Sequence, residues 1–375
     1  MTTGNIFSSC TDDFEKLNTS NIQVDPADLP FAAQCTEPMT YCYPPQQNMF
    51  QFWTNLTIDL YGGYFMTPNG NFTNGDMGEN RGHSGGMYEN YYLHIFNNTR
   101  RIIAQCDASG ERGLSGVMRI VQAYGTLMTT DAYGPIPYSS ILSGENEVYF
   151  EFDSQKDLYK AMLEDLSTAI TDISAMGADE IAKLKSFDCW CNGDKDLWVK
   201  IANTMKLRMA LRLSKRETEA GNAGMNLKAI ATEAAQNTLA TVNKDILIDK
   251  SLENEMWLMF NWGDCGFNAN LVTIMSGTKD PRQPLYMTLN TGDIKNEAGT
   301  TTVAANSQYL GIRFASGLPA KPNSWGNFSG WIQGNNGSSY SMPLPIMKAA
   351  EAYFLLAEAK LRWDIGSESE IGRAS

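Results

Sequence analysis

The sequence predicts a mainly α-helical protein built from irregular helical hairpins, with one loop-rich insertion that contains a few short strands. Three observations lead to this prediction. Apolar residues recur at helical spacing through most of the chain. Turn-forming Gly, Pro and Asn residues separate these segments at uneven intervals. Between about residues 239 and 341 the helical periodicity is missing, and short β-prone runs replace it.

Composition and charge restrict the classes of protein that this chain can represent. Its 375 residues are 43% hydrophobic and 11% aromatic, which is enough for a large core and too apolar for disorder. The sequence has no apolar run long enough to span a bilayer. The formal net charge of −13 leaves no basic stripe to bind phosphates, so we exclude nucleic-acid binding.

The first part of the chain is predicted to be an extended arm followed by two helices. Residues 19–45 are rich in proline and polar side chains, which favours extended structure. Apolar residues predict a helix over 46–64, ended by two glycines, and a second helix over 87–106. Residues 68–86, between these helices, form a loop by composition.

A long apolar helix that ends in a rigid turn is the central element of the predicted fold. Its buried face is formed by Leu114, Val117, Met118, Val121, Tyr124 and Met128. The helix must end near Gly134-Pro135-Ile136-Pro137, because each proline fixes its own φ and disfavours the α conformation of the residue before it. Tyr133 and Tyr138 flank this turn.

Three further helices are predicted before the insertion. Ser154 and Asp157 form a capping-box signal for the first, and the other two cover 194–215 and 225–237. Helix and loop alternate in units of uneven length, as in irregular hairpins of the tetratricopeptide type, although no strict period of about 34 residues is present.

Residues 239–341 differ from the rest of the chain. Their β-prone runs lie among Gly, Asn and Ser residues, at 246–248, 256–260, 285–289 and 309–314. The helical signal returns at 344–363, which is apolar on nearly all sides and is therefore predicted to be buried.

Four segments, in order, carry a resemblance to the SusD/RagB family of nutrient-binding outer-membrane lipoproteins. The helix and turn LSGVMRIVQAYGTLMTTDAYGPIPYSSIL at 114–142 resemble the family's corresponding element. The run EAYFLLAEA within 344–362 is similar to the family's helical-hairpin segment. Residues 10–18 and 194–215 add two further segments, so the resemblance covers residues 10–363.

The resemblance implies a division of the chain into three parts. Residues 1–18 would be a lipoprotein signal remnant and mature N-terminus, because Ile6-Phe7-Ser8-Ser9-Cys10 looks like the end of a bacterial lipoprotein signal, with Cys10 as the candidate for lipidation. A chance small-small-Cys triplet is the alternative. Residues 19–363 would form the helical domain, and residues 364–375 are interpreted as a truncated tail.

Catalytic and metal sites are not predicted. Glu351 and Glu358 lie two turns apart on one helix face, as in a glycosidase acid pair, but we interpret them as structural acids paired with Arg208 and Arg212. With two histidines in the chain, no Cys/His zinc pattern can be assembled, and no cofactor motif is present.

Seven cysteines leave the disulfide state open. Cys35 and Cys42 are the one pair close enough in sequence to suggest a small disulfide loop, and buried free thiols are the alternative. Cys189 and Cys191 are interpreted as free thiols.

Aromatic residues in the loop-rich regions are the candidate ligand contacts. An aromatic ring can cover the apolar C–H face of a sugar while Asn or Gln side chains bind its hydroxyls. Phe65 and Phe267 belong to the same class, although any single ring could instead form part of the insertion's own core. The candidates, chosen because loops rich in Gly, Ser and Asn cannot bury all such rings in regular structure, are Trp325, Phe328, Trp331, Tyr340, Trp262 and Phe72.

The resemblance implies a non-catalytic protein that binds oligosaccharides for delivery to a SusC-like TonB-dependent transporter in the outer membrane. Three alternatives remain open from the residues. The ligand could be a peptide, the chain could be a helical scaffold that recognises only a protein partner, or Glu351 and Glu358 could serve a glycoside hydrolase.

Overall fold

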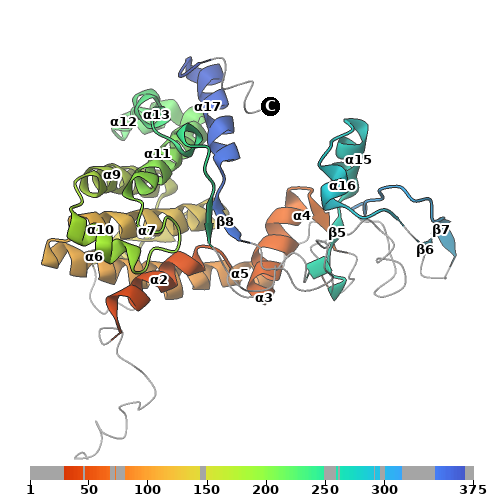
Figure 1. The fold of residues 1–375 in the computed structure, drawn as a ribbon, viewed down its shortest axis with the longest axis horizontal. Coiled ribbons are helices and arrows are strands. Elements are labelled where there is room, and N and C mark those ends of the chain that lie inside the picture. Colours follow the sequence, from red (N-terminus) through yellow and green to blue (C-terminus); the bar gives the residue numbers. More distant parts are fainter. Residues whose placement is uncertain are drawn as a thin grey trace, which may run out of the picture.

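The computed structural model describes residues 29–44, 47–67, 72, 81–143, 149–248, 259–260, 262–290, 292–295, 300–314 and 343–367. A large helical body and a smaller lobe lie next to one another (Figure 1). None of the described helices is both long enough and apolar enough to cross a bilayer.

The helical body confirms the prediction of a mainly helical fold. Its helices stack in order along the chain, with α6 on α7, α7 on α9, α9 on α11, and α11 on both α13 and α17. A π-helical segment, η4 (Tyr91–Phe96), joins α5 to α6. The helices are α2 (Phe31–Tyr41), α5 (Arg81–Asn90), α6 (Asn97–Ser109), α7 (Arg112–Tyr133), α8 (Ser139–Ser143), α9 (Gln155–Ser174), α10 (Ala178–Lys185), α11 (Lys195–Arg212), α12 (Glu217–Asn222), α13 (Leu227–Ala235) and α17 (Ala349–Trp363), with 3-10 turns η5 (Leu213–Arg216) and η6 (Leu239–Thr241).

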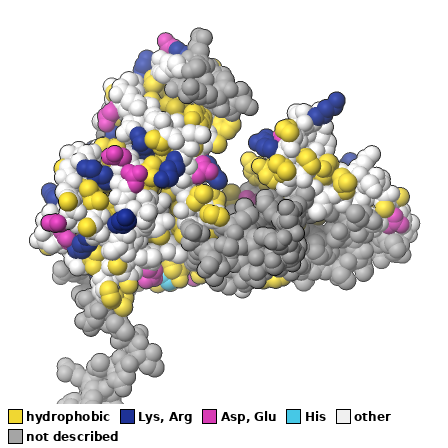
Figure 2. Space-filling view, in the orientation of Figure 1, with side chains coloured by type: hydrophobic (Ala, Val, Ile, Leu, Met, Phe, Trp, Pro, Cys, Tyr) yellow, Lys and Arg dark blue, Asp and Glu magenta, His cyan; other side chains and the backbone are white. Residues whose placement is uncertain are grey.

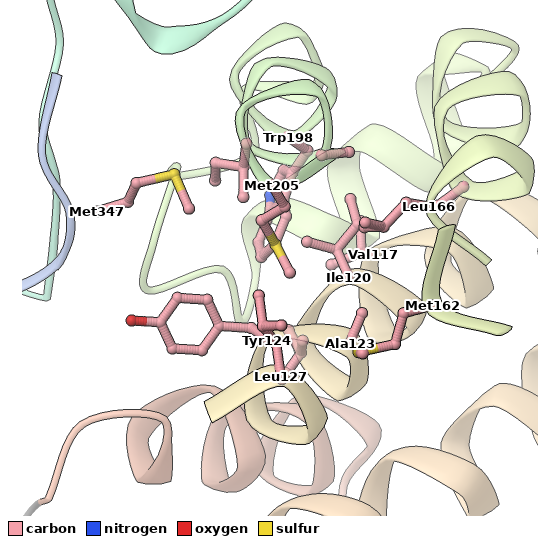
Figure 3. Close-up of a cluster of buried hydrophobic side chains, with 14 of the residues drawn as sticks. Val117, Ile120, Ala123, Tyr124, Leu127, Met162, Leu166, Trp198, Met205 and Met347 are labelled. Atoms are coloured by element: carbon pink, nitrogen blue, oxygen red, sulfur yellow. The ribbon is translucent and has the colours of Figure 1, made fainter. Parts of the chain in front are cut away.

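The core of the helical body is centred on α7, as Figure 3 shows. Fully buried side chains of this helix meet others from α9 and α11, and each such burial stabilises the fold by about 1.5–3 kcal/mol. Tyr124 of α7 also donates a hydrogen bond from its hydroxyl to the backbone oxygen of Ile346, at 2.8 Å. The labelled side chains are Val117, Ile120, Ala123, Tyr124, Leu127, Met162, Leu166, Trp198, Met205 and Met347.

The predicted end of the central helix is confirmed. After Tyr133, Gly134 adopts φ +80°, in the left-handed region that favours glycine, and its carbonyl accepts a hydrogen bond from the Thr130 hydroxyl at 2.7 Å. Strand β2 (Ile136–Pro137) then pairs antiparallel with β3 (Phe152–Asp153). The predicted cap of the next helix is also present, because the Ser154 hydroxyl accepts from the Asp157 backbone N–H.

The small lobe contains α3 (Gln47–Phe50), the π-helical η2 (Gln51–Ile58), α4 (Asp59–Tyr61), α15 (Ala269–Gly277) and α16 (Gln283–Tyr286). Strand β1 (Phe65–Met66) pairs with β5 (Gly266–Phe267), and β6 (Ile294–Lys295) pairs with β7 (Thr301–Val303). The small lobe has a separate hydrophobic cluster of buried residues. The insertion begins and ends at one antiparallel ladder, formed by β4 (Ile246–Ile248) and β8 (Leu344–Met347).

Several local predictions were wrong. Residues 31–41, predicted as extended, form α2, because burial of Cys35 and Met39 outweighs the weak helical propensity of this segment. Residues 344–347, predicted as the start of a helix, pair with β4 instead. The helix α17 that follows is not buried on nearly all sides, since Phe354 and Leu361 are exposed.

Within the insertion, α15 was not predicted, and the run at 285–289 begins in α16 rather than in a strand. The run at 309–314 forms a single bridge at Ile312 instead of a strand, and most of the run at 256–260 lies outside the described residues.

Cys35, Cys42, Cys189 and Cys191 are all free thiols, so the suggested disulfide loop does not form.

Candidate ligand-binding site

The structure describes two of the six candidate ligand contacts, Trp262 and Phe72. The other four, Trp325, Phe328, Trp331 and Tyr340, lie outside the described residues, as does the candidate lipidation site Cys10. Trp262 and Phe72 both lie in the small lobe.

Trp262 lies at the surface of the small lobe, and 36% of it is exposed. The residues after it are fixed to η2 by two buried hydrogen bonds. The Asp264 carboxylate accepts from Gln51 Nε2 at 2.8 Å, and Cys265 Sγ accepts from Asn55 Nδ2 at 3.1 Å. The exposed part of the Trp262 ring could cover an apolar face of a ligand next to this anchored turn.

Phe72 belongs to a group of three aromatic rings at the edge of the small lobe. Its ring meets the edge of His83 at a centroid distance of 5.8 Å, and His83 stacks on Phe52 at 4.2 Å. Burial lowers the pKa of His83, so this imidazole is neutral at pH 7. Phe72 is half-buried. One part of its ring packs against the hydrophobic cluster of the small lobe, and the rest is at the surface.

Phe65 and Phe267 belong to the core of the small lobe. They face one another across the β1–β5 pair with ring centroids 5.3 Å apart, and they are 8% and 2% exposed. Neither ring is placed to contact a ligand. The more open apolar surface of this lobe covers α15 and α16, where Figure 2 shows hydrophobic side chains gathered and where Ile274 and Leu285 are exposed.

The structure separates the four predicted ion-pair residues into different pairs. Glu351 accepts two hydrogen bonds from Arg208, from Nε and Nη2, each at 2.6 Å. Glu358 instead accepts from Arg362 Nε at 2.6 Å, one turn away on α17. Arg212 binds neither predicted glutamate, because its guanidinium is hydrogen-bonded to Asp131 at the end of α7.

Glu351 and Glu358 thus belong to two separate ion pairs, one with Arg208 of α11 and one with Arg362 of α17. Both carboxylates are engaged by arginine side chains, as expected of structural acids. Among the described residues, no group of three or more His, Cys, Asp or Glu side chains could hold a metal ion.

The anchors Gln51 and Asn55 were not identified from the sequence. A signal was present, since two amide side chains four residues apart in an otherwise apolar helix lie on one face and need partners if that face is buried. Their partners, Asp264 and Cys265, are more than two hundred residues away, so the pattern could not identify them.

The sequence matches a model of one protein family. A family model described as "SusD-like: Susd and RagB outer membrane lipoprotein" matches residues 15–371. No curated protein matches the sequence.

Solved structures are similar over most of the chain. A SusD-like protein from Bacteroides thetaiotaomicron has 25% identity and a TM-score of 0.72, over 90% of this chain and 67% of its own. A homologue from Bacteroides ovatus has 25% identity and a TM-score of 0.73, over 91% and 67%. A chitin-binding homologue from Flavobacterium johnsoniae has 24% identity and a TM-score of 0.74, over 90% and 67%. The chain thus spans about two thirds of the length of these proteins.

Proposed function

Because the chain belongs to the SusD and RagB family of outer membrane lipoproteins, we propose that it captures oligosaccharides outside the cell and delivers them to a SusC-like TonB-dependent transporter. It is a non-catalytic binding protein. In this proposal a lipid on Cys10 anchors it to the outer membrane. One of the similar structures is a chitin-binding protein, which supports a glycan as the class of ligand.

The observation that best supports glycan binding is the exposed ring of Trp262 beside an anchored turn. An indole held at the surface by a fixed turn can cover a sugar ring with little loss of conformational entropy on binding. In our proposal Trp325, Phe328, Trp331, Tyr340 and Phe72 add further aromatic contacts.

Binding of the purified chain to a panel of neutral oligosaccharides and short peptides tests the proposal. Trp262→Ala and the pair Trp325→Ala/Trp331→Ala should each weaken glycan binding by about fivefold or more, since stacking of a base on an aromatic side chain contributes roughly 1–3 kcal/mol and we expect a sugar ring to behave similarly. Tyr149→Ala is the matched control, because Tyr149 is 87% exposed on the helical body. Binding of peptides alone, or glycan binding unaffected by all three tryptophan changes, would refute this assignment.

A further inference from the structure

A cavity of about 630 Å³ lies on the helical body, formed by the end of α7, the start of α9 and the end of α11, together with η5, α12 and the turn before α13. One wall is apolar and consists of Leu213, Ala220 and Met225, of which the last two are buried. The volume is in the range of sites that hold small ligands.

The polar side of this cavity has more basic than acidic groups. Lys156, Arg212 and Arg216 line it, against Asp131 and Glu219. This excess is unusual on a chain with a net charge of −13. Figure 2 shows basic and acidic side chains interspersed over the helical body.

The two carboxylates of the cavity do not neutralise all three of its cations. Asp131 is bound to Arg212 and also accepts from the Tyr159 hydroxyl at 2.7 Å, so this carboxylate is fully engaged inside the cavity. Burial lowers the pKa of Arg212.

The remaining two cations are available to a ligand. The pair between Arg216 and Glu219 measures 3.1 Å but is mostly exposed, at 73% and 54%, so it contributes little. In the part of the chain that the structure describes, no carboxylate lies within ion-pair distance of Lys156. Lys156 is the second residue of α9, where the helix dipole also favours an anion.

We propose that this cavity is a second ligand site, which binds the anionic group of an acidic oligosaccharide. Lys156 and Arg216 bind the carboxylate of a uronate or the sulfate ester of a sulfated sugar, and the apolar wall covers the adjoining ring. A neutral sugar would offer no anionic group to Lys156 and would leave Arg216 with its exposed pair to Glu219 alone. This inference rests on the proposed function, because it specifies a class of glycan ligand.

Titration of the full chain with three probes of equal length tests the inference: an oligogalacturonate, a sulfated galactan oligosaccharide and a neutral galactan oligosaccharide. We expect at least one acidic probe to bind, and to bind less tightly as salt rises from about 50 to 500 mM. The Lys156→Ala/Arg216→Ala variant should weaken this binding by about tenfold or more. The acidic probe that responds identifies the anion as carboxylate or sulfate.

Both substitutions are at exposed positions, so the variant should fold normally, and its thermal midpoint checks this. The matched control is Arg282→Ala, since Arg282 is 66% exposed and lies in the small lobe. The inference is overturned if no acidic probe binds, if the double variant binds it as tightly as the unchanged chain, or if acidic peptides compete for the cavity and acidic sugars do not.

The outcomes for the two ligand proposals are distinct. Neutral glycan binding that depends on the loop tryptophans, without binding of any acidic probe, would remove only the second site. Absence of binding to every glycan, neutral or acidic, would remove the proposed function together with it.

Discussion

At the scale of single residues, the buried carboxylate of Asp188 determines the structure of the loop between α10 and α11. It accepts hydrogen bonds from the backbone N–H groups of Trp190, Cys191 and Gly193 and from Trp198 Nε1, at 2.8–3.0 Å. Trp190 and Trp198 stack at a centroid distance of 5.2 Å. One acidic side chain thus satisfies four donors, three of them buried, and positions two large rings in the core.

Replacing Asp188 with alanine should lower the free energy of unfolding by about 3 kcal/mol or more, because several buried donors lose their acceptor. Asp188→Asn should cost less, since its amide keeps one acceptor oxygen. Urea unfolding measures both. Asp179→Ala is the control, as Asp179 is exposed on α10, and a loss at Asp188 no larger than at Asp179 would contradict this account.

Asp59 in the small lobe gives the protein a pH-dependent stability. Burial raises the pKa of this carboxyl to about 7, from an ordinary value of 3.8, and Asp59 Oδ2 has no hydrogen-bond partner among the described residues. Between these two pKa values the folded state binds more protons than the unfolded state. The contribution of Asp59 to stability is therefore present below about pH 4 and is lost as the pH rises through 7.

Asp59→Asn should remove this dependence. The variant should be more stable than the unchanged chain at pH 8, by up to a few kcal/mol, and close to it at pH 4. Urea unfolding of both proteins from pH 4 to 8 measures the difference in their free energies of unfolding. The titration of all other groups is common to both proteins and cancels in this difference. A difference that stays constant over this range would show that Asp59 titrates normally.

At the scale of elements, α7 and α9 approach closely at Gly116. A Cβ atom on Gly116 would lie 3.1 Å from Ile173 Cγ1 and 3.2 Å from the Ala169 Cα atom, so the two helices have little room for a side chain there. This position therefore sets the separation of the two central helices.

Gly116→Val should lower the free energy of unfolding by about 2–3 kcal/mol, because the added methyl groups force α7 and α9 apart. Gly221→Ala is the opposite case. It lies in α12 with no neighbour within 4 Å of the added Cβ, so we expect a gain of about 0.5–1 kcal/mol from helix propensity. Thermal and urea unfolding compare the two, and equal effects would contradict the close contact.

How well the sequence predicted an element depended on how local its determinants are. The end of α7 and the cap of α9 were predicted, since Gly134-Pro135 and Ser154 act within a few residues. Strand β8 was not, because Leu344–Met347 form a strand by pairing with β4 about a hundred residues earlier in the chain. Long-range pairing of this kind has no signature in a short window.

The same limit applies to the candidate sites. The sequence identified acids and arginines that needed partners, but the actual partner of Arg212 follows from the ends of α7 and α11 lying together. Similarly, the turn after Trp262 is held by a hydrogen bond from η2. The cavity lined by Lys156, Arg212 and Arg216 is formed by residues from several helices and turns. Contacts assembled from separate elements cannot be derived from spacing alone.

At the scale of the whole molecule, the helical body and the small lobe each have a hydrophobic cluster of their own. The cluster of the small lobe is much the smaller, so we expect it to open at a lower free energy than the core around α7. Each cluster contains a buried free thiol that reports on it, Cys265 in the small lobe and Cys106 in the body.

Pulsed thiol labelling at increasing urea, followed by peptide mass spectrometry, should modify Cys265 before Cys106. Burial raises the pKa of both thiols, so neither should react until its cluster opens. Simultaneous labelling of the two cysteines at every urea concentration would mean that the protein unfolds as one cooperative unit.

The ladder between β4 and β8 has a consequence for how such proteins diversify. The intervening chain leaves the helical body and returns to it at one place, where Tyr124 holds Ile346 across 222 positions of sequence. Mutation or length change in the excursion therefore leaves the contacts among α6, α7, α9 and α11 in place. Evolution could vary this segment while the helical framework was inherited unchanged.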